Sequence, residues 1–279
     1  MSRGKLDLRG RSLVWGARTY VMGVVNITPD SFSRDGTSDP DAATAIAMQQ
    51  RDAGSDILDF GAESTRPGHQ PIDEATELAR LMPVLERFRA ADKTSIVSID
   101  TFKPAVFRRA HAAGGDILNS IWGLDEALLD VAVECGVPVI AMHNKSVAEY
   151  RDVVDEVLAV LAATAERAVK RGIKPENVIL DPGIGFGKTA DHNLELLGAL
   201  DRLVALGFPT LLGTSRKSTL GKLTGKPVTD RVYGTAATVA LAAAAGIDIV
   251  RVHDVGAVHD VVAVSDAIVR KWRPADWGT

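Results

Sequence analysis

The sequence has only one cysteine, Cys135, so no disulfide can form within the chain. Structural disulfides belong to oxidising compartments, and a chain without them is typical of a reducing one. The residues after Met1 are charged and polar and lack the apolar segment of a secretory signal. The longest apolar run, residues 236–247, is too short to cross a bilayer. We therefore expect a cytoplasmic protein that has no membrane partner.

An excess of basic residues is also lacking. The 32 Lys and Arg residues are outnumbered by 36 Asp and Glu residues, which gives a net charge of −4. Because nucleic acids and anionic membranes bind basic surfaces, we expect neither of them to be the main partner. The apolar fraction of 46% is sufficient for one large core, and the charged fraction of 24% is ordinary for a globular protein.

Short apolar segments alternate with helical patterns along the chain. Eight segments read as strands: residues 20–26, 57–61, 96–100, 116–119, 138–143, 178–181, 210–213 and 249–253. Apolar residues at helical spacing lie between them, in residues 42–53, 78–88, 104–113, 126–134, 150–171, 191–205, 234–245 and 257–271. Asp73 is the expected N-cap of the second of these helices.

This alternation predicts the fold. Strands that are apolar throughout are typical of a parallel sheet covered on both faces. No Gly-x-Gly-x-x-Gly segment follows the first strand, although an open doubly wound sheet would normally carry one there. We therefore predict a single α/β domain over residues 1–279. It is a closed (β/α)8 TIM barrel, preceded by a short N-terminal β-hairpin within residues 1–19.

Polar residues stand at the ends of nearly all the predicted strands. In such a barrel the carboxyl ends of the strands carry the chemistry. A first group, Asp100, Asn119, Asp181 and Lys217, offers two carboxylates, one amide and one cation. This set suits a flat heterocycle that has an N–H edge and a carbonyl group. A ring without that edge would leave a buried group unpaired, which costs roughly 1–3 kcal/mol.

A second group suits a polyphosphate. Asn26, Arg66, Arg251 and His253 follow the first, second and eighth predicted strands. Arginine presents a planar fork of donors to phosphate oxygens, and histidine adds a further donor. Mg²⁺ would help to bind the negatively charged phosphates, because it prefers a few protein oxygens together with phosphate.

Each of these residues also has a structural interpretation. Asp100 and Asp181 could be turn or cap residues. His253 could pair with Asp254, and Lys217 could form a solvated charge pair with Arg216. A carboxylate metal site would need Asp100 and Asp181 to converge from different sides of the barrel. A further set, Lys188 with His192 and Asn193, is expected to orient a loop or cap a helix.

Six segments, in this order, resemble the signature motifs of the dihydropteroate synthase family: VNITPDSF (25–32), GAESTRPG (61–68), SIDT (98–101), DPGIGF (181–186), GTSRKS (213–218) and RVHD (251–254). The resemblance implies a (β/α)8 barrel that joins 6-hydroxymethyl-7,8-dihydropterin diphosphate to 4-aminobenzoate with release of pyrophosphate. It also implies Mg²⁺, a place in folate synthesis, inhibition by sulfonamides and a homodimer formed through outer helices.

The resemblance assigns roles residue by residue. The residues matched to the reaction itself are Asp100, Asp181, Lys217 and Arg251. The pterin pocket is matched by Asp100, Asn119, Asp181 and Lys217, by Arg251 over the pterin face and by the apolar Ile121 and Met142. The diphosphate site is matched by Asn26, Arg251 and His253, with Asn26 also near the metal. Thr65, Arg66 and Pro67 match a mobile loop, and Phe186, Lys217 and Ser218 match the aminobenzoate side.

The sequence departs from the family after the fourth strand. The usual Asn-Asp-x-Ser-Gly is here Asn119-Ser120-Ile121-Trp122-Gly123, so an acidic residue is missing and an indole replaces a small hydroxyl. This departure leaves two alternatives to the synthase. One is a pterin-binding paralogue with weak or no synthase activity. The other is a folate-dependent methyltransferase, which would have no use for the diphosphate group of residues.

Overall fold

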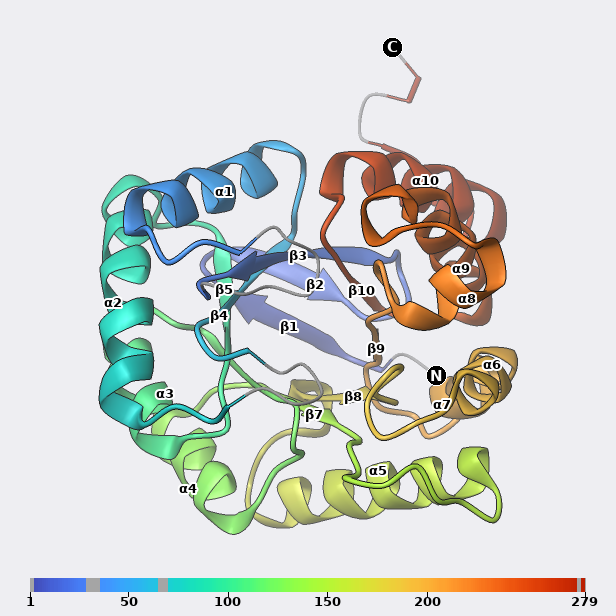
Figure 1. Ribbon diagram of the computed structural model, residues 1–279, viewed down its shortest axis with the longest axis horizontal. Coiled ribbons are helices and arrows are strands. Elements are labelled where there is room, and N and C mark those ends of the chain that lie inside the picture. Colours follow the sequence, from blue (N-terminus) through green and yellow to red (C-terminus); the bar gives the residue numbers. More distant parts are fainter. Residues whose placement is uncertain (1–2, 29–35, 65–69, 275–276, 279) are drawn as a thin grey trace.

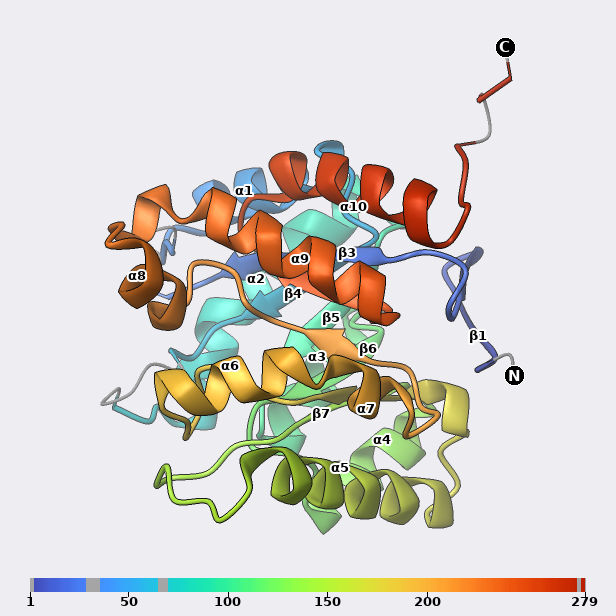
Figure 2. The same ribbon diagram turned by 90° about the vertical axis from the view of Figure 1, so that its right-hand side faces the viewer.

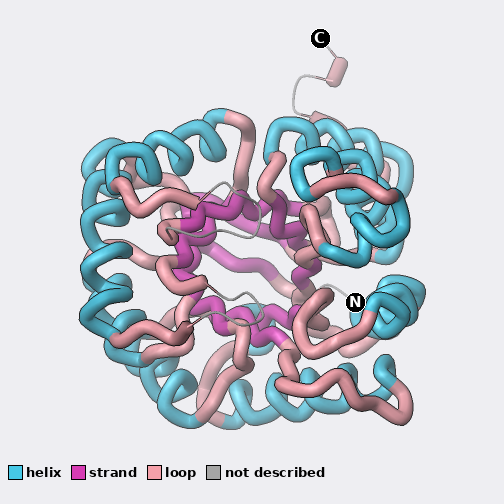
Figure 3. Tube along the Cα trace, viewed as in Figure 1, coloured by secondary structure: helices cyan, strands magenta, loops and turns pink. Residues whose placement is uncertain are grey.

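The computed structural model describes residues 3–28, 36–64, 70–274 and 277–278, and in it a ring of parallel strands is surrounded by helices (Figures 1 and 3). The strands of the ring are β3 (Tyr20–Asn26), β4 (Ile57–Gly61), β5 (Ile96–Asp100), β6 (Ile117–Ser120), β7 (Val139–Met142), β8 (Val178–Asp181), β9 (Leu211–Leu212) and β10 (Ile249–Val252). Their order is β8-β7-β6-β5-β4-β3-β10-β9, and an isolated parallel bridge between Leu180 and Thr210 closes the ring. The predicted (β/α)8 barrel is confirmed.

Ten α-helices occupy the described residues and cover the outside of the barrel. They are α1 (Pro40–Asp52), α2 (Glu74–Ala91), α3 (Pro104–Ala112), α4 (Glu126–Cys135), α5 (Val153–Lys170), α6 (Ala190–Gly198), α7 (Leu200–Val204), α8 (Ser218–Thr224), α9 (Val232–Ala245) and α10 (Val255–Val269). Short 3-10 helices lie at Pro175–Asn177 and Val228–Asp230. The predicted cap of α2 is confirmed, because the Asp73 side chain accepts the Thr76 N–H at 2.7 Å. No described helix has the length and apolar character that crossing a bilayer requires.

One helical prediction was wrong in detail, and one helix was not predicted. Residues 191–205, expected as one helix, form α6 and α7 with a break at Ala199, directly after Gly198. Glycine has a low helix propensity, which explains the position of the break. Helix α8 was not predicted, because its seven residues STLGKLT include a glycine and are too few to show a helical period.

A two-stranded hairpin closes one end of the barrel. Strands β1 (Lys5–Leu8) and β2 (Arg11–Val14) are antiparallel, and the turn residues Arg9 and Gly10 both have positive φ angles, 53° and 74°. Positive φ at both turn positions matches the right-handed twist of a two-residue hairpin. Figure 2 shows β1 at the end of the barrel opposite to α8. The predicted hairpin is confirmed.

The amino-terminal half of the barrel interior is apolar. A cluster of buried side chains takes one residue from most strands of the ring and adds three from the hairpin region: Tyr20, Met22, Ile57, Ile96, Ile117, Ile140, Ile179, Leu211 and Ile249, with Leu6, Leu13 and Trp15. A second, larger cluster lies between the strands and the helices. The inner cluster therefore forms a floor beneath the carboxyl ends of the strands.

Side-chain alternation sets what lies above this floor. In β4, Ile57 belongs to the inner cluster, whereas Leu58 and Phe60 belong to the outer one. Because successive side chains of a strand point to opposite faces, Asp59 and Gly61 follow Ile57 on the inside of the barrel. The same alternation in β5 places Ser98 and Asp100 inside, above Ile96. The interior therefore changes from apolar to polar toward the carboxyl ends.

The hairpin of β1 and β2 and the following Trp15, which together close the amino-terminal end of the barrel and are called the plug, generate a stability prediction. Trp15 is almost fully buried in the inner cluster, and its indole N–H donates to the Glu176 carbonyl at 2.9 Å. Trp15→Ala should therefore lower the free energy of unfolding by about 3–5 kcal/mol, measured by denaturant titration. The matched control is Trp122→Ala, since the Trp122 side chain is 50% exposed and its loss should change stability by at most about 0.5 kcal/mol. Equal losses in the two variants would contradict the plug.

Candidate functional site

An ion-pair network occupies the polar half of the barrel interior. The Nε of Arg251, from β10, donates to Asp59 at 2.6 Å, and its second guanidinium nitrogen donates to Asp100 at 3.2 Å. Asn119, from β6, donates its amide to both Asp59 oxygens, at 3.1 and 3.3 Å. Strands β4, β5, β6 and β10 thus contribute one side chain each to a single connected network.

The charges of this network raise the proton affinity of Asp100. Asp59 is fully buried, and Asp100 is nearly so. Burial, followed by the negative charge of Asp59, raises the pKa of Asp100 to about 7, although Arg251 opposes the increase. Asp181 adds a third carboxylate to the pocket, and among the described residues Arg251 and Lys217 are cations that act on Asp100 or Asp181. A ligand that presents N–H donors would suit these carboxylates.

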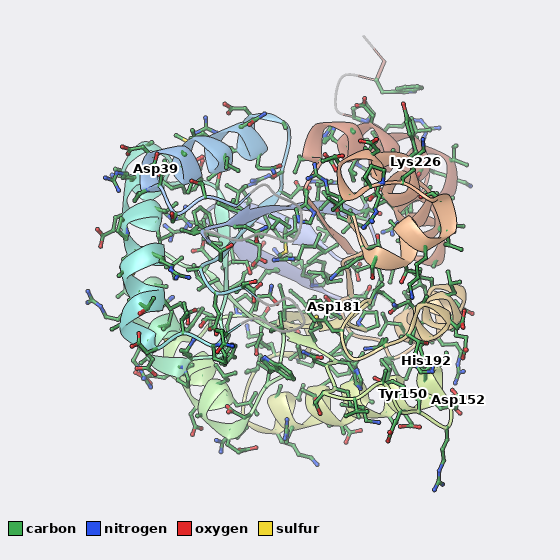
Figure 4. The ribbon with its side chains drawn as sticks, in the orientation of Figure 1. Asp39, Tyr150, Asp152, Asp181, His192 and Lys226 are labelled. Atoms are coloured by element: carbon green, nitrogen blue, oxygen red, sulfur yellow. The ribbon has the colours of Figure 1, made fainter. Side chains whose placement is uncertain are left out.

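Asp181 combines a turn role with a site role. Its Oδ1 accepts the N–H of Gly183 at 2.7 Å, which is the turn geometry considered from the sequence. Burial raises its pKa to about 6, and this increase is opposed by that hydrogen bond and by the charges of Lys217 and Arg251. In Figure 4 its side chain lies toward the middle of the ring. One carboxylate oxygen therefore holds the turn, while the carboxylate as a whole interacts with the charges of Lys217 and Arg251.

Lys217 lies on the same side of the pocket as Asp181. Its Nζ is 4.0 Å from the centroid of the Phe186 ring, a cation–π contact. Burial and the charge of Arg251 lower its pKa to about 8, while Asp181 and Asp100 act in the opposite direction. Lys217 does not form the solvated charge pair with Arg216 that was considered as an alternative. It is instead a partly buried cation next to an aromatic wall.

The strand ends near Lys217 are fixed by two polar pairs. Arg216 has a positive φ of 58°, and its guanidinium makes two hydrogen bonds to Asp254, at 3.0 and 2.5 Å. His253 contacts the Ser215 hydroxyl through its backbone N–H at 3.1 Å and through Nδ1 at 2.9 Å. Asp254 therefore pairs with Arg216.

The other predicted site residues are placed as follows. Ile121 and Met142 are buried, Asn26 is the partly buried last residue of β3, and Ser218 is the exposed first residue of α8. Thr65, Arg66 and Pro67 lie outside the described residues. No group of three or more His, Cys, Asp or Glu residues within the described ranges could hold a metal ion. Asp100 bonds to Arg251, so the carboxylate metal pair has no support.

The sequence analysis missed Asp59. The predicted site residues stand at strand ends, whereas Asp59 stands in the middle of the apolar strand Ile57-Leu-Asp-Phe-Gly61. A charged residue between apolar neighbours in a buried strand is the signal that could have found it, because buried carboxylates are seldom left unpaired. With it, a third carboxylate enters the pocket.

Lys188, His192 and Asn193 organise the loop after β8, as expected. The Lys188 Nζ donates to the carbonyl oxygens of Gly183 and Phe186, both at 3.0 Å. His192 completes a capping box with Thr189 at the start of α6. Asn193 accepts the Gly185 N–H at 2.8 Å and donates to the Thr219 hydroxyl at 3.0 Å. This loop carries Phe186 toward Lys217.

The departures from the family motif lie outside the network. Leu118 belongs to the outer cluster and Asn119 faces the interior, so Ser120 follows Leu118 onto the outer face of β6. Ser120 is fully buried there, and its hydroxyl has no hydrogen-bond partner among the described residues. Trp122 is half exposed. The acidic side chain that Ser120 replaces would therefore point away from the pocket.

The network generates a prediction about protonation. Asp59→Asn removes the charge that, after burial, does most to raise the pKa of Asp100. The pKa of Asp100 should therefore fall from about 7, as measured by carbon-13 NMR titration of the aspartate carboxyl groups. The pKa of Asp181 serves as the internal control and should change little, because Asp59 is not among the causes of its shift. An unchanged Asp100 titration would contradict the coupling.

Comparisons with known proteins agree with this geometry. Residues 22–253 match the sequence model of the family described as pterin binding enzyme. The chain is 44% identical to the dihydropteroate synthase of Clostridium beijerinckii, over 86% of this chain and 90% of that protein. It is 39% identical to the inactive dihydropteroate synthase 2 of Mycobacterium leprae, over 85% and 86%. It superimposes on the Xanthomonas albilineans dihydropteroate synthase bound to 4-aminobenzoic acid with a TM-score of 0.89, 40% identity and coverage of 98% and 100%. The chain therefore belongs to the dihydropteroate synthase family of pterin-binding enzymes.

Proposed function

We propose that this protein is a dihydropteroate synthase, a transferase of folate biosynthesis. It condenses 6-hydroxymethyl-7,8-dihydropterin diphosphate with 4-aminobenzoate and yields 7,8-dihydropteroate and pyrophosphate. The observation that carries the proposal is the convergence of Asp59, Asp100, Asn119 and Arg251 in the barrel interior. The relatives named dihydropteroate synthase and the structure with bound 4-aminobenzoic acid support the same reaction.

The pocket suits recognition of a pterin ring. A pterin carries N–H and amino donors on one edge and a carbonyl group beside them. Asp100 and Asp181 supply acceptors for the donors, and Asn119 and Lys217 supply donors for ring acceptors. Because these groups are largely buried, a ring that fails to pair with them leaves a polar group unsatisfied at a cost of about 1–3 kcal/mol. Ile121 and Met142 supply apolar walls.

The reaction needs no protein nucleophile. The bond between the pterin methylene carbon and the diphosphate oxygen breaks, and pyrophosphate leaves with the bonding electron pair. The electron-rich dihydropterin ring stabilises the electron-deficient methylene group, and nearby carboxylates stabilise the positive charge that develops on the ring. The aminobenzoate nitrogen then forms the new carbon–nitrogen bond and loses a proton. Arg251 and His253 would stabilise the departing negative charge.

Phe186, Lys217 and Ser218 are proposed to hold the aminobenzoate. Phe186 and Lys217 are already in contact, so an aromatic ring and a cation stand together beside the pterin pocket. Ser218 adds an exposed hydroxyl at the adjacent start of α8. An aromatic acid fits this combination, because its ring can pack on Phe186 while its carboxylate meets donors.

Mg²⁺ is proposed to assist at the diphosphate. The fit depends on Asn26, whose amide oxygen is a hard ligand at the carboxyl end of β3. Because Mg²⁺ commonly takes one or two protein oxygens and completes its shell with phosphate and water, a three-residue cluster is not needed. The bound ion would supply neutralisation of the leaving group's charge. Asn26 would hold it beside the diphosphate-binding Arg251 and His253.

A homodimer in the cytoplasm is also proposed. Helices α9 and α10 lie together on one side of the barrel (Figure 1) and expose large apolar side chains. Tyr233 and Leu241 on α9 are 85% and 63% exposed, and Val264 and Ile268 on α10 are 61% and 73% exposed. Neighbouring exposed apolar residues are typical of protein interfaces. The single cysteine supports a reducing compartment.

The decisive measurement is turnover, because one relative with 39% identity is named inactive. Purified protein given both substrates and Mg²⁺ should release pyrophosphate and form dihydropteroate, and omission of 4-aminobenzoate should stop dihydropteroate formation. A protein that binds pterin without forming dihydropteroate would be the pterin-binding paralogue instead. Chelation of Mg²⁺ should lower the rate.

Asp181→Asn separates the site role of this residue from its turn role. An asparagine oxygen can still accept the Gly183 N–H, so the melting temperature should change little. Loss of the carboxylate charge should reduce turnover by about 100-fold or more, measured by pyrophosphate release. A large drop in melting temperature would instead assign Asp181 mainly to the turn.

The dimer proposal is tested on α10. Ile268→Glu places a charge in the exposed apolar face of α9 and α10 and should convert a dimer to a monomer in sedimentation equilibrium. Val160→Glu on α5 is the matched control, because Val160 is 49% exposed on a helix outside this face. Dissociation by both variants, or by neither, would contradict an interface at α9 and α10.

A further inference from the structure

Lys188 makes an unusual set of contacts that the proposed reaction does not use. Its Nζ lies 3.0 Å from each of the Gly183 and Phe186 carbonyl oxygens and 3.4 Å from the His143 carbonyl oxygen. It also lies 3.0 Å from Nδ1 of His143. One amine therefore sits among three backbone carbonyls and an imidazole nitrogen, which come from the loops after β7 and β8.

The imidazole is suited to accept a hydrogen bond from this amine. Burial, followed by the charge of Lys188, lowers the pKa of His143 to about 4. The ring is therefore neutral near pH 7, and the tautomer with the proton on Nε2 has an Nδ1 that can accept from Lys188. Burial also lowers the pKa of Lys188 to about 7, but the amine keeps N–H donors in either protonation state. The contacts thus depend on donors and not on a formal ion pair.

The loop that Lys188 holds fits against its neighbour without room for side chains. A Cβ added at Gly183 would lie 2.0 Å from the His143 carbonyl oxygen, and one added at Gly187 would lie 2.0 Å from the Lys145 carbonyl oxygen. Both glycines also have positive φ, 69° and 55°. Close approach brings carbonyl groups together, and Lys188 supplies the donors that such a cluster of carbonyls needs.

Further contacts fix the outer side of the same loop. The Tyr150 hydroxyl donates to the Gly187 carbonyl at 2.9 Å, and the Tyr150 ring packs edge-on against His192 with centroids 5.1 Å apart. Figure 4 shows Tyr150 and His192 near each other at the rim, with Asp181 farther inside. Lys188 is therefore the inner support of this loop, and Tyr150 is its outer support.

Two site residues depend on the peptide groups that Lys188 binds. Gly183 accepts from Lys188 through its carbonyl and donates its N–H to Asp181 at 2.7 Å. Phe186 accepts from Lys188 through its carbonyl while its ring lies against Lys217 at 4.0 Å. Movement of these peptide groups would therefore shift the Asp181 carboxylate and the Phe186 ring together.

We propose that Lys188 is a positioning residue for the synthase reaction. It acts from behind the pocket wall, as an internal donor that sets Phe186 for the aminobenzoate and Asp181 for the pterin. This inference rests on the proposed function. Removal of the donors should therefore weaken aminobenzoate binding. The melting temperature should change little, because Tyr150 and Asn193 still hold the loop.

The first test compares two lysine substitutions. Lys188→Met keeps the length of the stem and removes the donors, and it should raise the KM for 4-aminobenzoate by about tenfold to a hundredfold, with a smaller change in kcat. Lys170→Met is the matched control, because Lys170 is exposed at the last position of α5, the end of that helix farther from Tyr150. It should leave the KM unchanged. An unchanged KM in Lys188→Met would overturn the proposal.

A second test asks whether donors alone restore the site. Lys188→Ala is prepared in methylammonium, so that the space left by the lysine is filled, and is then dialysed while circular dichroism is recorded. Removal of methylammonium should raise the KM for 4-aminobenzoate, and its return should lower it again. Tetramethylammonium, which has no N–H donor, should not lower it. Unfolding on dialysis, or equal recovery with both cations, would overturn the positioning role.

Amide hydrogen exchange separates failure of this inference from failure of the proposed function. Exchange of the Gly183, Gly185 and Phe186 amides is measured in protein without substrates. It should be faster in Lys188→Met than in wild type, and unchanged in Lys170→Met. A wild type without synthase activity would remove the proposed function and leave this loop test valid. Unchanged exchange in Lys188→Met would overturn the inference even in an active enzyme.

Discussion

The pocket depends on the ion pairs that Arg251 makes with Asp59 and Asp100. Three carboxylates, those of Asp59, Asp100 and Asp181, stand at one end of a closed barrel, and isolated buried charges are very costly. Arg251 bonds to two of them at once, at 2.6 and 3.2 Å. Burial, followed by the charge of Asp59, still raises the pKa of Asp100 to about 7. The buried carboxylates therefore suit a ligand that donates hydrogen bonds.

The apolar half of the barrel makes this polar half possible. A single ring of mainly isoleucine side chains, together with the hairpin that covers it, supplies a dry floor from the amino ends of the strands. Stability can then come from the floor, the outer helices and the ion pairs at the amino ends of the strands, such as Arg3 with Asp248 and Arg18 with Asp56. Other strained and charged features lie at the carboxyl ends. Arg216, with its positive φ and its paired Asp254, is one such feature. Lys188, in the loop after the neighbouring strand β8, is another.

The sequence predicted the barrel well, because β-branched runs that stop at polar or turn residues are local signals. Four strands, β3, β4, β5 and β8, begin and end at the predicted residues. Strand β9 lacks the predicted Thr210 and Gly213, and Thr210 directs its N–H and its hydroxyl to the buried Asp248. Asp59 was missed because its partners are far away in sequence: Asn119 is 60 residues distant and Arg251 is 192 residues distant. Pairings over such separations leave no periodicity to read, and the resemblance to a family supplied only the residues at its motifs.

The way the ring closes has a consequence for motion in the pocket. Strand β9 has two residues, and it meets β8 through one bridge, Leu180 with Thr210, and the hydrogen bond from the Leu180 N–H to the Pro209 carbonyl at 2.9 Å. Every other neighbouring pair of strands has at least two residues in register. Asp181 lies on one side of this seam, and Lys217 follows the strand on the other. A bicyclic ligand could therefore widen the pocket at the junction of β8 and β9, because few backbone hydrogen bonds would break there. This junction lies between Asp181 and Lys217, on the side of the pocket where the two substrates must meet.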